Sequence, residues 1–262
     1  MVLGKHLQNL NFNWERILLE IDPQEVPVFK FSITPQEFLE FAREDIKNVE
    51  TRGIVNAISN VKRSIDCQID TVITFLGYDP FANKQPAHVL SYIDDYENMH
   101  SKINAAMKLK LIQAIGAAPH GVLSRVRTLR NKLEYGYKLP SHDDVQEGIE
   151  IASMFIKAIK YYLSRFDCAP IVTCNDERDP TISIGYCYQE YTFKATAMDQ
   201  YFNKYFEDIF VDKDNEMYLP LVHLFGALGT EDDVRGAIIG LLRASNIEVP
   251  QKISAKVEII IS

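Results

Sequence analysis

At the centre of the chain stands the stretch Arg130-Asn131-Lys132-Leu133-Glu134-Tyr135-Gly136-Tyr137. The apolar residues that lead into it recur at helical spacing, at Val122, Val126, Leu129 and Leu133. This period predicts an amphipathic helix with one buried face. A helix is often followed by a residue in the left-handed conformation, which glycine adopts at little cost. Gly136 is therefore expected just past the helix end. A polar loop then leads to the next helix.

Two helices are predicted before this stretch. Thr34, Pro35 and Glu37 have the spacing of a capping box with proline in the first turn, which marks a helix start. A second helix is expected over about 52–76 and ends at Gly77. Its polar side carries Asn56, Asn60 and Arg63, and its apolar side repeats at helical spacing through Ile54, Ile58, Val61, Ile65, Ile69, Val72 and Leu76.

Further helices complete a predicted antiparallel helical bundle over residues 34–168. Residues 88–115 read as helix with a break near 98–101, and Gly116 stops it. Ser141 and Asp144 form a second capping box, after which apolar residues alternate every four and three positions up to Phe166. Pro170 marks the end of this region.

The segments on either side of the bundle show strand-like alternation as well as helical spacing. The predicted fold class is therefore mainly α, and α+β overall. Residues 169–262 are predicted to form a small α+β domain, with a hairpin over 182–197, helices over 198–210, 219–228 and 231–244, and a strand over 252–261. Residues 1–33 are expected to be an N-terminal extension with a short helix over 14–20. Residues 26–33 alternate as a strand and are a candidate to join the C-terminal sheet.

Bulk composition is that of an ordinary globular chain: 262 residues, 47% hydrophobic and 24% charged. No apolar run approaches the roughly 20 residues of a membrane helix, and residues 1–14 lack a signal-peptide core. We therefore expect a soluble cytoplasmic protein. The four cysteines, Cys67, Cys168, Cys174 and Cys187, lack metal-site spacing and are expected as buried free thiols. No metal, cofactor or phosphate-binding glycine loop is indicated.

Charge is unevenly distributed. The net charge is −8, which disfavours a general nucleic-acid coat. Residues 101–138 nevertheless contain one acid, Glu134, against the basic residues Lys102, Lys108, Lys110, Arg125, Arg127, Arg130, Lys132 and Lys138. A local positive field would attract phosphates. The alternative is a solvated face that acidic neighbours balance.

The central stretch, the run 56–66 and the capped helix after Ser141 together resemble the HEPN family, over roughly residues 35–166. Active members of this family are helical bundles that cut RNA without metal, using an Arg-polar-x-x-x-His motif, and dimerise so that two motifs face one cleft. The resemblance implies that Arg130 stabilises phosphate and that Asn131 is the small polar residue after it. Tyr135 occupies the histidine position.

The tyrosine at the histidine position of the motif decides the expected activity. Metal-independent cleavage lets the 2′-hydroxyl attack the adjacent phosphate, which needs a group that moves protons near neutral pH and a cation for the developing charge. Histidine and arginine suit these roles. A phenol with a pKa near 10 is a poor base at neutral pH, although it can stack on a base. We expect an impaired endoribonuclease, either naturally inactive or altered to remove toxicity. Arg127, Lys132, Lys138 and Arg63 are its candidate RNA-binding residues.

Two other functions stay open. Tyr137 matches the position of a tyrosine that, in one branch of the family, a partner nucleotidyltransferase adenylylates to silence a toxin. The chain would then belong to a toxin–antitoxin or defence system with a partner protein. Alternatively, the bundle is a non-catalytic module for dimerisation and partner binding. In that case Arg130 is a surface ion-pairing residue, and Tyr135 and Tyr137 are packing residues at a helix end.

Overall fold

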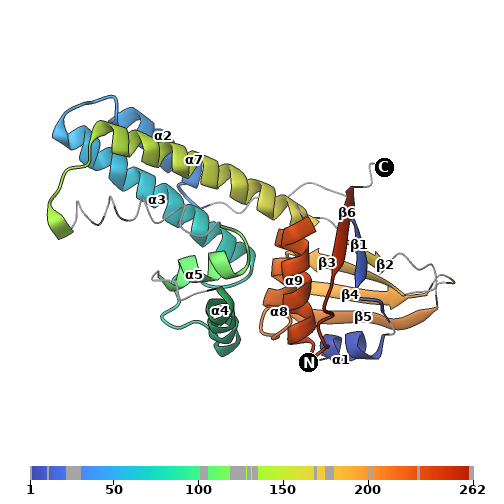
Figure 1. Ribbon diagram of the computed structural model, residues 1–262. Helices are drawn as coiled ribbons and strands as arrows, with labels where there is room; N and C mark the ends of the chain where they lie inside the picture. Colours follow the sequence, from blue (N-terminus) through green and yellow to red (C-terminus); the bar gives the residue numbers. More distant parts are fainter. Residues whose placement is uncertain are drawn as a thin grey trace.

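Three long helices pack side by side into an elongated arm, and a sheet with its own helices lies at one end of that arm (Figure 1). The arm consists of α2 (Pro35–Asp45), α3 (Thr51–Phe75) and α7 (His142–Ser164). This computed structural model describes residues 2–10, 12–21, 31–100, 106–118, 128, 131, 135–167, 170–174, 180–199, 201, 203–228 and 231–259.

The arm forms where the capping signals and apolar stripes predict it. Both predicted capping boxes are present, with Thr34 at the start of α2 and Ser141 at the start of α7. The predicted stripe of α3 is buried throughout. Gly77 and Gly116 take positive φ values of 77° and 74° just after their helices. In Figure 1, α2 runs antiparallel to α3, whereas α3 and α7 run in the same direction.

Outside the arm, α5 (Met107–Ala114) packs against α3, and α4 (Ala87–His100) packs against α5 (Figure 1). They correspond to the predicted helix over 88–115, although residues 98–100, where its break was expected, are still helical in α4. Residues 101–105 between them, and most of the helix predicted before Gly136, lie outside the described residues.

The sheet has six described strands in the order β5-β4-β3-β2-β1-β6. Only β1 and β6 pair in parallel among them, and all other neighbours are antiparallel. Helices α8 and α9 cover one face (Figure 1). The remaining elements are α1 (Val2–Asn9), β1 (Arg16–Ile21), η1 (Arg165–Asp167), β2 (Ile171–Cys174), β3 (Thr181–Cys187), β4 (Thr192–Met198), β5 (Lys204–Asp212), α8 (Tyr218–Ala227), α9 (Glu231–Ala244) and β6 (Ser254–Ile259).

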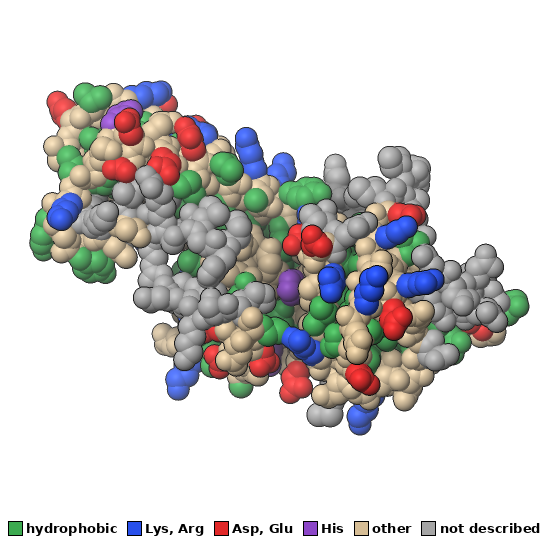
Figure 2. Space-filling model, in the orientation of Figure 1, with side chains coloured by type: hydrophobic (Ala, Val, Ile, Leu, Met, Phe, Trp, Pro, Cys, Tyr) green, Lys and Arg blue, Asp and Glu red, His purple; other side chains and the backbone are tan. Residues whose placement is uncertain are grey.

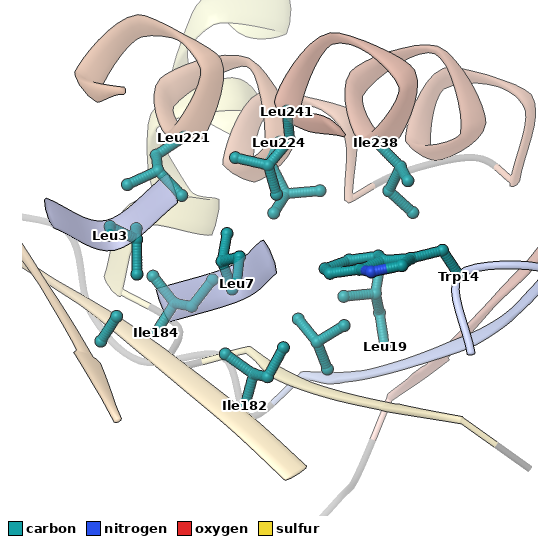
Figure 3. A pocket seen from close by; sticks show the side chains of 12 residues that line it. Leu3, Leu7, Trp14, Leu19, Ile182, Ile184, Leu221, Leu224, Ile238 and Leu241 are labelled. Atoms are coloured by element: carbon teal, nitrogen blue, oxygen red, sulfur yellow. The ribbon is translucent and has the colours of Figure 1, made fainter. Parts of the chain in front are cut away.

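The core of the sheet unit is apolar and closely packed. Side chains from α1, β1, β3, α8 and α9 point toward one another in Figure 3, with Trp14 closing one side. The cavity among them has a volume of about 10 Å³ and no polar lining. A space of this size without polar partners stays dry. This is therefore packing between sheet and helices, not a ligand site.

Several elements of the sheet unit match their predictions. The hairpin is β3–β4, α8 and α9 lie where helices were expected, and β6 covers most of the predicted last strand. Both predicted capping boxes and the α+β class are likewise confirmed.

Two predictions at the flanks are wrong. The short helix over 14–20 is instead a turn followed by β1, which pairs with β2 on one side and β6 on the other. The helix over 198–210 is replaced by β5, where a register shift against β4 and a positive φ at Asp208 break the alternation that marks a strand. The predicted strand over 26–33 lies mainly outside the described residues, and residues 31–33 are not strand.

The arm and the sheet unit are joined through backbone carbonyls at the end of α3. A helix leaves its last carbonyls without partners in the helix. Here the hydroxyl of Tyr186 donates to the Phe75 carbonyl at 2.9 Å, and that of Tyr218 donates to the Leu76 carbonyl at 3.1 Å. The ammonium of Lys213 donates to the Gly77 carbonyl at 2.6 Å. The sheet unit thus supplies the cap of the longest helix described.

Candidate functional site

The motif stretch ends in a solvent-exposed turn before α7. Asn131 is helical and half-buried, and Tyr135 and Gly136 are helical and exposed. The side chain of Tyr135 is 76% exposed and that of Tyr137 is 90% exposed. Lys138 is exposed as well. Neither tyrosine contributes to the core, so the alternative of two packing residues at a helix end does not describe them.

The helix end lies one residue later than predicted. Gly136 keeps a helical backbone, and Tyr137 takes the left-handed conformation, with a φ of 51°. A side chain in this region costs conformational energy that glycine avoids. The expected left-handed glycine at 136 is therefore wrong. Pro140 is buried and Ser141 caps α7, so the downstream end of the turn is held in place.

Three basic residues of the predicted site come before the described turn in the sequence. Arg130, Arg127 and Lys132 all lie outside the described residues. The described part of the predicted site therefore comprises Asn131, Tyr135, Tyr137 and Lys138. It does not include the guanidinium of Arg130, which the motif assigns to phosphate binding.

Part of the predicted basic stretch is neutralised. Lys108 pairs with Asp70 at 2.7 Å, and Lys110 pairs with Glu97 at 2.9 Å. Burial raises the pKa of Asp70, and Lys108 partly offsets this effect. For these two lysines the predicted balance by acidic neighbours is correct, although the pairs are partly buried and not a solvated face. Figure 2 shows acidic and basic side chains interspersed over the arm, whereas Lys and Arg side chains gather over the sheet unit on this face.

The polar side of α3 forms an open groove with α2. The groove has a volume of about 470 Å³ and is lined by Phe41, Glu44, Asp45, Asn56, Ser59, Asn60 and Arg63. All three polar residues predicted on this face of α3 are present. Asn60 connects two other residues of the groove: its Nδ2 donates to Asp45 Oδ2 at 2.8 Å and its Oδ1 accepts from Arg63 Nη1 at 3.1 Å.

The α2 half of this groove was not singled out from the sequence. Asp45 ends α2, and the short turn after it folds α3 back so that Asn60, fifteen residues later, reaches it. The sequence signal that could have indicated Asp45 is a polar residue at the end of a predicted helix, followed by a short connection to a second helix. It does not reveal which residue of α3 would pair with it.

Two described histidines, His88 and His223, contact tyrosine hydroxyls that lie outside the motif. His88 Nε2 is 3.1 Å from the hydroxyl of Tyr78, and His223 Nδ1 is 3.2 Å from that of Tyr92, both where the arm meets α4 and the sheet unit. His142 is exposed at the start of α7, a few residues after the motif turn. Cys67 is free and only half-buried, and burial raises its pKa to about 11. Among the described residues no cluster of His, Cys, Asp or Glu could hold a metal ion.

Comparison of the chain with protein-family models, with curated proteins and with solved structures gives no match. No helix in the described part of the chain is long and apolar enough to cross a membrane. The described residues therefore define an α+β protein with an exposed polar turn before α7 and a polar groove between α2 and α3.

Proposed function

We propose that this chain is a HEPN-type RNA-targeting protein of a toxin or defence system, and that Tyr135 impairs its metal-independent endoribonuclease centre. In this proposal it works as a homodimer in which two motifs face one cleft. The observation that carries the proposal is the exposure of Tyr135 and Tyr137 on the turn that joins the motif to the capped helix α7. A large aromatic side chain held in solvent there is available to a ligand.

The roles follow from the chemistry of the side chains. Arg130 would bind phosphate oxygens through its fork of N–H donors, and Asn131 would support it. Tyr135 would stack on an RNA base but would not move protons at neutral pH. Arg127, Lys132, Lys138 and Arg63 would add phosphate contacts that weaken as salt increases.

RNA binding without cleavage is the first test. Anisotropy of a labelled single-stranded RNA in EDTA should show binding whose affinity falls with salt, with intact RNA recovered afterwards. Lys138→Ala should lower the affinity and reduce the salt slope by about 0.7. Lys84→Ala removes a charge from the exposed loop before α4 and serves as the matched control. Absence of RNA binding at low salt would contradict the proposal and favour the non-catalytic interaction module.

The exposure of Tyr137 also favours a second candidate, regulation by adenylylation. At 90% exposure its hydroxyl can reach an enzyme active site without unfolding of the turn. The phenol oxygen would attack the α-phosphate of ATP and release pyrophosphate. After incubation with the partner nucleotidyltransferase and ATP, the intact mass should rise by one AMP, and Tyr137→Phe should prevent this. An unchanged mass, or a modified Tyr137→Phe variant, would argue against it.

A further inference from the structure

The groove between α2 and α3 has the dimensions of a small-molecule site. Its volume of about 470 Å³ lies in the range of ligand pockets, which begins near 300 Å³. Its floor is polar, with Ser59 and Asn60 half-buried, and one rim is the ring of Phe41, 47% exposed. The ring of Phe38 meets that of Phe41 edge-on at 6.2 Å, which supports its orientation.

One amide organises the polar groups of this groove. Asn60 donates to Asp45 and accepts from Arg63, so both hydrogen-bonding ends of its amide are used. It holds a carboxylate and a guanidinium on either side of itself. Asp45 Oδ1 lies outside this bond and Oδ2 keeps a second lone pair, so both oxygens can accept from a ligand. Arg63 keeps most of its five donors. Asn60 is therefore a positioning residue.

Two other polar groups that line the groove already have partners, so they contribute little to ligand binding. Glu44 pairs with Lys47 at 2.7 Å, which offsets its charge. The hydroxyl of Ser59 donates to the Val55 carbonyl at 2.7 Å, within α3. What remains is one carboxylate, one guanidinium, the exposed amide of Asn56 and one aromatic face.

We propose that this groove binds a guanine nucleotide of single-stranded RNA. Guanine alone among the four bases presents two adjacent N–H donors on its Watson–Crick edge, which match the two oxygens of a carboxylate. Asp45 accepts from that edge, Phe41 stacks on the base, and Arg63 binds the phosphate. This inference deepens the proposed function and rests on it for RNA as the source of the nucleotide.

The test compares bases at constant length and charge. Three oligouridine RNAs carry a single guanine, inosine or adenine at the same position, and their affinities are measured by anisotropy in EDTA. Inosine lacks the second donor. The guanine RNA should bind about tenfold more tightly than the other two, because a bidentate contact to a base edge is lost with inosine and adenine.

Variants assign the contacts. Asp45→Asn should remove the preference for guanine, and Arg63→Ala should weaken all three RNAs alike. Asp94→Asn makes the same charge change on an exposed position of α4 and should leave the preference intact. Thermal melts establish that each variant is folded. Saturation-transfer NMR with guanosine and adenosine 5′-monophosphates tests the groove directly, without RNA.

Each outcome separates the two claims. Equal affinity for the three RNAs, or a preference that survives Asp45→Asn, overturns the guanine site and leaves the RNA-targeting function standing. Binding of guanosine monophosphate without binding of any RNA supports the groove and overturns RNA as its source. Absence of binding by both RNA and mononucleotide overturns both.

Discussion

Removal of the Tyr218 hydroxyl should measure how strongly the sheet unit stabilises the arm. Tyr218 is fully buried, and its hydroxyl donates to the Leu76 carbonyl at 3.1 Å. Leu76 is itself fully buried. Tyr218→Phe keeps the ring and leaves that carbonyl without its donor. An unsatisfied buried acceptor costs about 1–3 kcal/mol, so we expect a loss of about 2 kcal/mol.

The hydroxyl of Tyr218 is also in contact with a second tyrosine hydroxyl, so the two must be considered together. The Tyr186 hydroxyl lies 3.0 Å from that of Tyr218 and donates to the Phe75 carbonyl. Two hydroxyls have two protons for three contacts, so one contact is always without a proton. Both carbonyls accept a hydrogen bond only when each hydroxyl donates to its carbonyl and neither donates to the other hydroxyl. Tyr186→Phe should therefore cost a similar free energy of unfolding, because it removes the hydroxyl that donates to the Phe75 carbonyl. Because the two hydroxyls are in contact, the loss in the double variant should depart from the sum of the single losses by about 0.5–3 kcal/mol.

Denaturant unfolding followed by circular dichroism gives these free energies, with Tyr201→Phe as the control. Tyr201 is 74% exposed, so its hydroxyl should contribute less than about 0.5 kcal/mol. A loss of about 2 kcal/mol corresponds to a Tm lower by about 4–8 °C in a chain of this size. A Tyr218→Phe variant as stable as the Tyr201→Phe control would refute the capping role.

Four further predictions concern stability. Gly226→Ala should destabilise the protein by more than about 3 kcal/mol in urea unfolding, because a Cβ there would lie 2.1 Å from the ring of Tyr162. Gly236→Ala, in α9 with nothing within 4 Å, should stabilise by about 0.5–1 kcal/mol, and the opposite order would contradict the packing. Ser141→Ala should cost about 1 kcal/mol by loss of the α7 cap, and an unchanged melting curve would contradict it. Stability should fall as the pH rises above about 8. Burial raises the folded-state pKa of Cys67 to about 11 and raises the pKa of five tyrosines as well, so protons are lost on unfolding, first from the thiol and above about pH 10 from the phenols. Flat stability up to pH 11 would contradict this reasoning. The tyrosines are Tyr78, Tyr92, Tyr162, Tyr186 and Tyr218.

Local signals predicted the helical arm well. Thr34 and Ser141 cap their helices through contacts three residues away, and the stripe of α3 needs only its own period. The same holds for α9, which spans Glu231–Ala244 as predicted. Each of these features depends on residues close in sequence.

Long-range features were not predictable in the same way. β1 becomes a strand because two strands from distant parts of the chain flank it, and its six residues give no clear period. The caps that Tyr186 and Tyr218 provide join residues 111 and 142 positions apart. In the candidate site, the sequence indicated Asn60 and Arg63, but the partner Asp45 depends on how α2 packs on α3. The exposure of Tyr135 and Tyr137 likewise follows from the turn and not from residue type.

The most direct test of the proposed function is cleavage of RNA by the chain and by its Tyr135→His variant, side by side in EDTA. The account predicts that only the histidine form cuts, that the fragments end in a 2′,3′-cyclic phosphate, and that Arg130→Ala in that form abolishes cleavage. Equal cleavage by both forms, or cleavage that survives Arg130→Ala, would contradict it. Absence of cleavage by the histidine form would contradict the assignment of Tyr135 to the catalytic position.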